Sequence, residues 1–480
     1  MAKSVRVNFI YNIINTVSGF VFPLITYPYS FRILMADGIG EINFLNSIVS
    51  YVLLLTGLGI PLYGIREIAR VRDDRKELSK TTIEILLLNL LLNVIGYIVI
   101  FIIGFTVAEV KENAPLFFLL SISIVLTTLG CQWFYSGIED FKFVTIRGLI
   151  VRILCVIFLF IAVKNKNDLY WYGLYTVLVS SGNYIVNFVC LRNRISIRIV
   201  DFQELNILRH IKPAFTIFVF NLVTSIYLNL DKVMLGFIKD SQAVGYYTAS
   251  TQISHILLTI VAALGSVMLP RASNLIKQGN MDEFYRLAKK SYNFTLMLTM
   301  PLSFGCMVMS PILIHAFCGA SYEPSIMTLR IISPIIIMIG ISNIIGLQML
   351  YPLGKIKIVT LSTCVGAAVN LILNTILIPF FSQDGAAIAT LFAETSVTIF
   401  QIIMARSFIR FDLLPKYALR YFLSALIMAA ICFIIIQIKL SDISLLFIIP
   451  IVGGLVYGIQ LVLYKEPLVI EGIDLIKSKF

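Results

Sequence analysis

The sequence predicts an all-α polytopic membrane protein with about fourteen transmembrane helices, forming two pseudo-symmetric six-helix bundles and two additional C-terminal helices. Three observations predict this class: the composition, the recurrence of apolar runs of about 20 residues, and matches between the two halves of the chain. The 480 residues are 59% hydrophobic and 13% charged, with a mean hydropathy of +0.92. Because an ordinary soluble domain has roughly 25% charged residues, these values exclude a soluble multidomain protein.

Each apolar run is a candidate helix, because only helices and closed barrels satisfy their backbone hydrogen bonds in lipid. The first run is too long for a signal peptide and no small-residue cleavage site precedes it, so we expect it to remain as the first span. Pro23 and Pro28 predict a kink in that span. With a count of 12 to 14, the predicted spans lie near residues 8–31, 42–64, 81–107, 115–137, 144–163, 169–191, 213–237, 243–269, 291–317, 324–352, 358–380, 385–405, 417–438 and 442–464.

The basic residues predict the orientation, because short cytoplasmic loops carry the positive excess. With the N-terminus inside, 29 of the 38 Lys and Arg residues fall on the cytoplasmic side and only six on the outer side. Both termini are therefore predicted to be cytoplasmic. This asymmetry accounts for most of the net charge of +12, so nucleic-acid binding is not predicted. The seven cysteines lack paired or metal-type spacing, and we interpret them as buried packing residues without disulfides.

Three pairs of segments indicate an internal repeat with an offset of about 205 to 215 residues. Such duplicated halves are typical of transporters. Each half then has six spans in the same orientation, with a basic amphipathic loop after its second span that we expect to contact an anionic leaflet. The matching pairs are CQWFYSGIEDFKFVT at 131–145 with LQMLYPLGKIKIVT at 347–360, GIGEINFLNSI at 38–48 with AVGYYTASTQI at 243–253, and GIPLYGIREIARVRDDRKEL at 59–78 with VMLPRASNLIKQGNMDEFYRL at 267–287.

The repeat also predicts the domain organisation. A polar linker at 192–212 separates the two halves. We therefore expect an N-terminal six-helix bundle over residues 1–200 and a C-terminal six-helix bundle over 201–410. Residues 411–480 would add two transmembrane helices and a cytoplasmic tail.

Charged residues inside the spans are the first candidates for a binding site, because a charge at membrane depth costs roughly 2.5–3.5 kcal/mol on insertion scales. In the stretch TSIYLNLDKVMLGF at 224–237, Lys232 shares one side of a helical projection with Asn229. Asp231 lies about 100° further round, so the two charges do not face each other. Lys232 either binds a substrate or ion or forms a structural pair. The other polar members of its arc are Asn221, Thr224 and Ser225.

Further candidates follow from depth in the apolar runs. Arg152 and Arg330 are either anion-binding or snorkelled structural residues, and Arg32 is either a site residue or an interfacial anchor. Glu84 and Glu394 are candidates for coupling to a proton or sodium ion, beside Asp231 as a gating residue. The first span presents a polar line that includes Asn12, while His255 and His315 are expected mainly to pack. The candidate cations outnumber the candidate carboxylates, which favours an anionic substrate.

Three segments resemble the Wzx-type polysaccharide (O-antigen and capsule) flippase family of the multidrug/oligosaccharidyl-lipid/polysaccharide exporter superfamily. TYPYSFRILMADGIGEINFLNSIVSYVLLLTGLGIPLYGIREIAR at 26–70 is similar to its first two helices. NLDKVMLGFIKDSQAVGYYTAS at 229–250 is similar to its seventh helix and following turn, and QWFYSGIEDFKFVTIR at 132–147 to the exit of its fourth. The resemblance covers about 400 residues, and none of its motifs is catalytic.

The resemblance implies two six-helix bundles around a central cavity that opens alternately to either side of the bacterial cytoplasmic membrane. Its implied substrate is an oligosaccharide repeat unit on undecaprenyl pyrophosphate, moved from the inner to the outer leaflet, with a polysaccharide polymerase and chain-length machinery as further partners. Basic residues would hold the pyrophosphate, and Asn and aromatic groups the sugars. Arg32, Asp231 and Lys232 carry over from aligned motifs. The family more often has twelve spans, so helices thirteen and fourteen depart from it and would add a lipid groove or complete the packing.

Other functions stay open at this point. A multidrug cation antiporter shares the superfamily fold but would be expected to have a more acidic cavity. A membrane glycosyltransferase or polymerase would be an enzyme, and it would usually need a large outer loop with acidic residues, which the short predicted outer loops do not provide. An assembly protein would not need charges inside duplicated halves. The sequence has no nucleotide-binding P-loop and no predicted cofactor, so we expect a transporter coupled to an ion gradient, the membrane potential or downstream consumption, and no enzyme.

Overall fold

The computed structural model describes residues 5–196, 199–408, 416–438 and 441–477, apart from some side chains within helices. Every regular element in this part of the chain is a helix, which confirms the predicted all-α membrane fold. Ten of the helical stretches are long and apolar enough to cross a membrane. Two of these, Val21–Val71 and Ile356–Ala405, are 51 and 50 residues long and each contains a break, so each holds two of the predicted spans.

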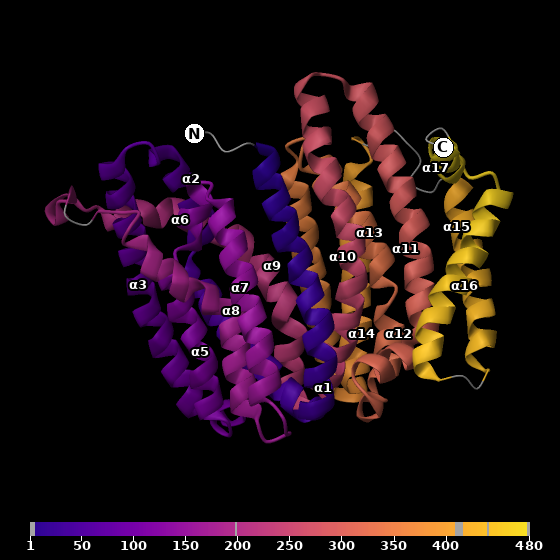
Figure 1. Ribbon diagram of the computed structural model, residues 1–480, viewed down its shortest axis with the longest axis horizontal. Helices are drawn as coiled ribbons and strands as arrows, with labels where there is room; N and C mark the ends of the chain where they lie inside the picture. The colour runs from indigo at the N-terminus through magenta and orange to yellow at the C-terminus, as the bar shows by residue number, and fades with distance from the viewer. Residues whose placement is uncertain (1–4, 197–198, 409–415, 439–440, 478–480) are drawn as a thin grey trace. The chain divides into compact units, whose positions relative to one another are not determined.

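The chain divides into two compact units, Met1–Gly245 and Tyr246–Phe480. The first unit holds helices α1 to α9, drawn from indigo to magenta in Figure 1. Their bounds are α1 Val5–Gly57, α2 Ile60–Val71, α3 Arg75–Thr106, α4 Ala108–Lys111, α5 Ala114–Leu129, α6 Gln132–Gly137, α7 Phe141–Ala162, α8 Leu169–Leu191, the short 3-10 turns η2 Phe202–Glu204 and η3 Ile207–His210, and α9 Ile211–Ile238.

The second unit continues to the C-terminus, and its α15 and α16 pack against α11 (Figure 1). Its core combines side chains of α10, α11, α13, α15 and α16, among them the fully buried Tyr421 and Ile345. Its elements are α10 Ser241–Lys277, α11 Met281–Phe317, the 3-10 turn η4 Ala320–Tyr322, α12 Ser325–Ile332, α13 Ile335–Asn343, the π-helical η5 Ile344–Leu350, α14 Ile356–Ala405, α15 Lys416–Ile436, α16 Asp442–Leu463 and α17 Pro467–Lys477.

The break in α1 lies at Met35, whose φ of 57° leaves the helical region, and not at Pro23 or Pro28 as the sequence predicts. A second break lies at Ser382 in α14, with φ of 50°. The break at Met35 falls within the predicted connection around residues 32–41, which is shorter than expected because helix continues on both sides of Met35. Both prolines are accommodated inside the helix, and the kink falls where the backbone conformation, not the missing N–H group, interrupts the helix.

Helix α1 and the start of α10 approach each other closely within the first unit. A side-chain carbon on Gly40 would collide with the backbone of Ser241 and Gly245. A side-chain carbon on Gly245 would in turn collide with the backbone carbonyl of Ala36. Only glycine permits backbones to approach this far. The aligned repeat segments 38–48 and 243–253 place these two glycines at the same position of the repeat.

The two predicted basic loops are also wrong as loops. In the first half, the predicted span 42–64 ends at Gly57, and residues 60–71 form the separate amphipathic helix α2. In the second half, α10 runs on to Lys277 and α11 begins at Met281, so only three residues form the turn. The side chain of Asp74 caps α3 by accepting hydrogen bonds from the backbone amides of Lys76 and Glu77 at 2.8 and 3.2 Å.

Candidate functional site

A cavity of about 400 Å³ lies among the helices of the first unit. It is lined from α1, α2, α3, α5, α6, α8 and α9, so most of the unit contributes to its wall. The lining combines amide, hydroxyl and aromatic groups with apolar side chains. Its polar and aromatic members are Ser50, Thr56, Asn89, Thr127, Thr128, Gln132, Trp133, Tyr184 and Asn229.

Two backbone turns lie at the wall of this cavity. Leu58 and Gly59 have φ values of 40° and 72°, which end α1 and start α2 at the cavity wall. Cys131, with φ of 41°, separates α5 from α6 and turns Gln132 and Trp133 to line the cavity. Gly59 cannot carry a side chain here, because a Cβ atom would lie 2.5 Å from the backbone oxygen of Ala214.

Amide groups supply the hydrogen-bonding capacity of the cavity. Asn89 is only 6% exposed, and its Oδ1 has no hydrogen-bond partner among the described residues. Gln132 Oε1 accepts hydrogen bonds from Arg147 Nη2 at 3.1 Å and Asn187 Nδ2 at 3.3 Å, which fixes that side chain in place. A buried polar atom without a partner costs about 1–3 kcal/mol, so a ligand that donates a hydrogen bond to Asn89 would be stabilised.

The predicted residue Asn229 lines this cavity, and Lys232 follows it one helical turn later on α9. The Lys232 ammonium donates to Asn43 Oδ1 of α1 at 3.4 Å, and the side chain is partly buried. Asp231 is 7% exposed. Asp231 and Lys232 are not among the described residues that line the cavity, and the roles of Asn229, Asp231 and Lys232 stay predictions. The side chains of Asn12, Asn221, Thr224 and Ser225 lie outside the described residues.

The remaining predicted cations are distributed over both units. In the first unit Arg152 of α7 donates a hydrogen bond to the hydroxyl of Ser18 on α1, and Arg32 is exposed on α1. Neither is among the residues that line the cavity. In the second unit Arg330 of α12 is exposed and donates through Nε to the hydroxyl of Ser310 at 3.0 Å. Glu394 is partly buried in α14 of that unit.

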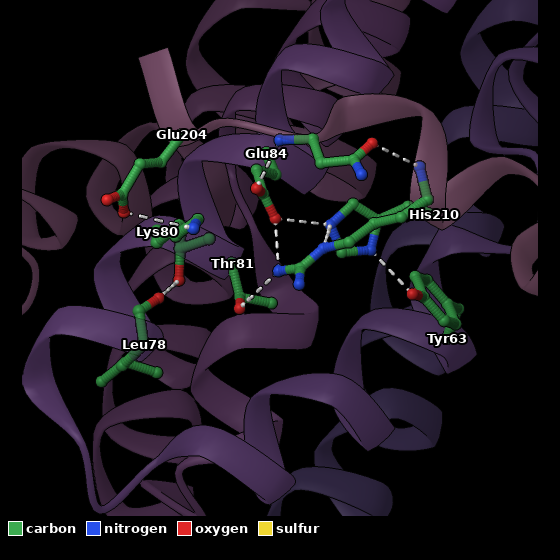
Figure 2. A network of polar contacts seen from close by, with 10 residues as sticks. Tyr63, Leu78, Lys80, Thr81, Glu84, Glu204 and His210 are labelled. Atoms are coloured by element: carbon green, nitrogen blue, oxygen red, sulfur yellow. Dashed lines mark hydrogen bonds and ion pairs between the residues drawn. The ribbon is translucent and has the colours of Figure 1, made fainter. Parts of the chain in front are cut away.

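Glu84 lies in a buried network that joins α3 to the linker before α9 (Figure 2). Its Oε1 accepts from the backbone amide of Asn206 at 2.7 Å, and its Oε2 is contacted by Arg209 Nη2 at 2.5 Å and His210 Nε2 at 2.9 Å. Tyr63 of α2 lies 2.7 Å from His210 Nδ1. Glu84 thus attaches the linker to α3, and Tyr63 attaches it to α2 through His210. A role of Glu84 in ion coupling stays a prediction.

One neutral tautomer of His210 meets its contacts to Glu84 and Tyr63, while Arg209 Nε also lies 3.3 Å from Nε2. If Nε2–H donates to Glu84, then Nδ1 accepts from the Tyr63 hydroxyl, and both contacts are satisfied by neutral imidazole. Burial lowers the pKa of His210, although the hydrogen bond to Glu84 opposes this shift and the charge of Arg209 adds to it. The histidine is therefore held in its neutral form.

A second cavity, of about 380 Å³, lies among α10, α11, α15 and α16 in the second unit. Its lining is apolar throughout except for the tyrosine Tyr457, with Leu298, Met309, Met428 and Ile449 among its members. Such a surface binds hydrocarbon and offers little to a sugar or phosphate. The structure therefore keeps polar and apolar binding capacity in separate cavities, each within its own unit.

Sequence reasoning missed Asn89, Gln132, Trp133 and Tyr184 as cavity residues. Asn89 and Asn93 stand four residues apart in an otherwise apolar run, and this spacing places two amides on one face of a helix. Gln132 and Trp133 belong to a segment that the internal repeat had already marked. Their position became apparent only with the left-handed turn at Cys131, which no periodicity signals.

Comparison with known proteins gives one family and several relatives. The model of the family described as "Polysaccharide biosynthesis protein" matches residues 5–276. The O-antigen transporter of Escherichia coli (strain K12) is 24% identical over 407 residues, which cover 84% of this chain and 97% of that protein.

Two solved structures share the fold. The lipid II flippase MurJ in an inward closed conformation has a TM-score of 0.67 at 16% identity, covering 96% of this chain and 100% of that one. An inward-facing multidrug resistance MATE family transporter of the MOP superfamily has a TM-score of 0.66 at 13% identity, covering 84% of this chain and 98% of that one. At these identities the two structures establish the fold alone.

Proposed function

Because the chain belongs to the polysaccharide biosynthesis protein family, we propose that it is a flippase for undecaprenyl-pyrophosphate-linked oligosaccharide units, which it moves from the inner to the outer leaflet by alternating access. Its product would serve the assembly of a surface polysaccharide such as O-antigen, lipopolysaccharide or capsule. The relative named an O-antigen transporter and the MurJ flippase fold support a transporter and not an enzyme.

The observation that carries this proposal is the lining of the cavity in the first unit. Sugars are bound by amide and hydroxyl groups that exchange hydrogen bonds with their hydroxyls and by aromatic rings that cover their apolar faces. Asn89, Gln132, Asn229 and Trp133 offer these groups together. The unpartnered Oδ1 of Asn89 is suited to accept from a sugar hydroxyl.

The same cavity argues against the multidrug cation antiporter, which shares the fold. A buried cation is stabilised most by a carboxylate that neutralises its charge. None of the described residues that line the cavity carries a carboxylate. Its neutral lining therefore favours a glycan over an organic cation. The fold that the chain shares with an antiporter does not identify a substrate.

The pyrophosphate of the substrate would be bound by predicted cations. Lys232 is the leading residue, because it follows the cavity residue Asn229 by one helical turn. Arg32 and Arg152 of the same unit would assist, and a phosphate contact to such a side chain is charge-assisted. Arg330 of the second unit stays a separate candidate for anion binding. Asp231 would gate the opening, and Glu394 or Glu84 would couple transport to a proton or sodium ion.

The apolar cavity of the second unit would suit a hydrocarbon chain such as a polyprenyl group. The cavity has no charged residue in its described lining, and α15 and α16 supply part of its wall. These are the two helices beyond the duplicated halves, so the proposal gives them a lipid-binding role. We further propose a bacterial cytoplasmic membrane location with both termini inside, which cysteine labelling from either side would test.

The test is a flipping assay with the purified protein in proteoliposomes, a lipid-linked oligosaccharide as the cargo, and an ion gradient present or absent. Lys232→Ala should slow flipping by roughly tenfold or more, because a charge-assisted contact contributes about 1.5–3 kcal/mol. Lys232→Arg should retain a good part of the activity. Asp231→Asn should reduce abundance or switching more than affinity.

The matched control is Lys239→Ala, which removes the same charge from an exposed position beyond the end of α9. It should flip normally. Normal flipping by Lys232→Ala at normal protein level would mean that the Lys232 contact to Asn43 is structural. A failure to move any lipid-linked oligosaccharide, with extrusion of an organic cation instead, would overturn the proposed function itself.

A further inference from the structure

The first unit has another cavity, of about 660 Å³, at the start of α7 and the end of α8. It shares no lining residue with the cavity of about 400 Å³ that Asn89 and Asn229 line. Three basic side chains line it, Lys142, Arg147 and Arg194, with one acidic side chain, Asp140. Arg194 Nη2 lies 2.9 Å from Asp140 Oδ2, so one positive charge is already paired. The cavity therefore keeps an excess positive charge, which favours an anion.

Arg147 is the most informative of these residues, because its guanidinium is buried. The side chain is 7% exposed, and only Nη2 donates, to Gln132 Oε1 at 3.1 Å. Its Cζ lies 5.4 Å from the centre of the Phe143 ring. Its Nε and Nη1 have no hydrogen-bond partner among the described residues. A buried guanidinium with two unsatisfied donors is expensive, and an anion in this cavity would satisfy it.

The other wall of the cavity is apolar and continues along α7. Ile146 and Ile150 line the cavity, and both are about half exposed. The exposed side chains Ile153, Ile157 and Ile161 follow at helical spacing on the same face. From Phe143 to Ile161 this stripe is roughly 27 Å long, close to the thickness of the hydrocarbon core. A group of basic residues at one end of a long apolar stripe fits a molecule with a phosphate head group and a hydrocarbon chain.

We propose that this cavity is a binding site for an anionic phospholipid, with its phosphate at Arg147 and Lys142 and an acyl chain along the exposed face of α7. The proposed occupant is a resident lipid of the membrane and not the transported cargo. It stands independently of the proposed function, because its residues line a different cavity. A bidentate guanidinium contact and a nearby ammonium are the usual protein ligands of a phosphate.

The experiment measures phosphatidylglycerol bound to the purified full-length protein by native mass spectrometry, with thermal unfolding in detergent as a second readout. Phosphatidylcholine is the neutral reference. The wild-type protein should retain phosphatidylglycerol and be stabilised by it more than by phosphatidylcholine. Arg147→Gln and Lys142→Gln should each weaken this binding by roughly tenfold, since each removes a charge-assisted contact. Lys142 is exposed, so its variant tests the site even if Arg147→Gln fails to fold.

The matched control is Arg192→Gln, which removes a positive charge from an exposed residue at the end of α8 that does not line the cavity. It should bind phosphatidylglycerol as the wild type does. Equal loss in Arg192→Gln would reduce the effect to overall charge and overturn the site. Equal stabilisation by inorganic phosphate would show a site for phosphate alone. Displacement of phosphatidylglycerol by a polyprenyl pyrophosphate at equimolar concentration would assign the cavity to the cargo instead.

Discussion

The segments that follow the second span of each half align in sequence but fold differently. In the first half, helix α1 ends at Gly57 and a separate helix α2 covers Ile60–Val71. In the second half, α10 continues to Lys277 and meets α11 after a three-residue turn. Both segments have a proline at the aligned position, Pro61 and Pro270. The proline therefore does not decide whether the helix breaks, since α10 contains Pro270 in its interior.

Two features of the first half account for the break. Leu58 and Gly59 adopt positive φ, and Gly59 approaches the carbonyl of Ala214 too closely for any side chain. The residue aligned with Gly59 is Met268, which lies inside the α10 helix. In addition, α2 has a partner in α6: a Cβ atom on Gly64 would lie 2.7 Å from the Trp133 ring, and one on Gly137 would lie 2.6 Å from Ile68. A break thus needs a glycine and a surface that receives the new helix.

The segment that aligns with α6, the partner of α2, also folds differently in the second half. Gln132 begins α6 after the left-handed turn at Cys131, and its side chain lines the cavity of about 400 Å³ in the first unit. The aligned Gln348 stays inside the π-helical η5, which continues directly from α13. Gln348 is 5% exposed, and its Oε1 has no partner among the described residues. The first half thus uses its glutamine at a cavity wall, whereas the second keeps the same residue inside a helix.

Gly59→Val should have the largest effect, because it tests the break directly. Valine would combine a strained positive φ with a collision against the Ala214 carbonyl, which costs on the order of 4 kcal/mol of unfolding free energy. Thermal unfolding in detergent and the yield of folded protein measure it. Met268→Gly at the aligned position should cost only about 1 kcal/mol, as glycine does inside a helix. If both variants lose the same stability, the break does not depend on Gly59.

Glu84→Gln should have an intermediate effect, because it weakens the network that holds the linker against α2 and α3 in the first half. The substitution removes the charge that Arg209 and His210 contact, at a cost of about 1–3 kcal/mol. The lower part of this range is expected, because Arg209 is 42% exposed and partly screened.

The matched control for Glu84 is Glu466→Gln in the second unit. Glu466 is also buried, but its contacts are to the Tyr421 hydroxyl at 2.6 Å and the Val469 amide at 3.0 Å. Both donors are neutral, and the carbonyl oxygen of glutamine can still accept a hydrogen bond. The loss of stability in detergent should therefore be smaller than for Glu84→Gln. The opposite order would show that the cationic partners of Glu84 do not matter.

The pH dependence of the same network should give the smallest effect. Burial lowers the folded-state pKa of His210, whereas an unfolded histidine titrates near about 6.5. As the pH falls below that value, the unfolded state takes up its proton first, so stability decreases until the folded-state pKa is passed. Above the unfolded-state pKa, His210 is neutral in the folded and the unfolded state, and stability does not depend on this group. His210→Gln should lower stability overall but flatten this decrease, as measured by thermal unfolding between about pH 5 and 7.5.

The apolar runs predicted the helices well because burial in lipid depends on local composition alone. The breaks at Met35 and Ser382 fall within the predicted connections at 32–41 and 381–384, but the sequence did not show that helix continues on both sides of each break. Pro23 and Pro28 do give a local signal, for which a kink was predicted, but both lie inside the helix and the break is at Met35.

The residues of the candidate site also differ in whether the sequence could predict them. Asn229 could be proposed because a polar residue in an apolar span stands out, and it does line the cavity. Trp133 and Tyr184 gave no such signal, because aromatic residues in a span are ordinary. They became site residues through the turn at Cys131 and the close contact of Gly130 with Tyr184. A sequence shows which residues are unusual for their medium, and only the tertiary structure shows which ordinary residues surround a cavity.

The close approach of Gly40 and Gly245 has a consequence for how this sequence can change over evolutionary time. Most core contacts allow a pair of compensating replacements, in which one side chain grows and its neighbour shrinks. Here each glycine faces backbone, and the opposite residue of the pair is already the smallest available. A larger residue at either position has no compensating replacement within the pair. The two copies of the repeat can therefore diverge almost everywhere else, but at this crossing each constrains the other to the residue it has now.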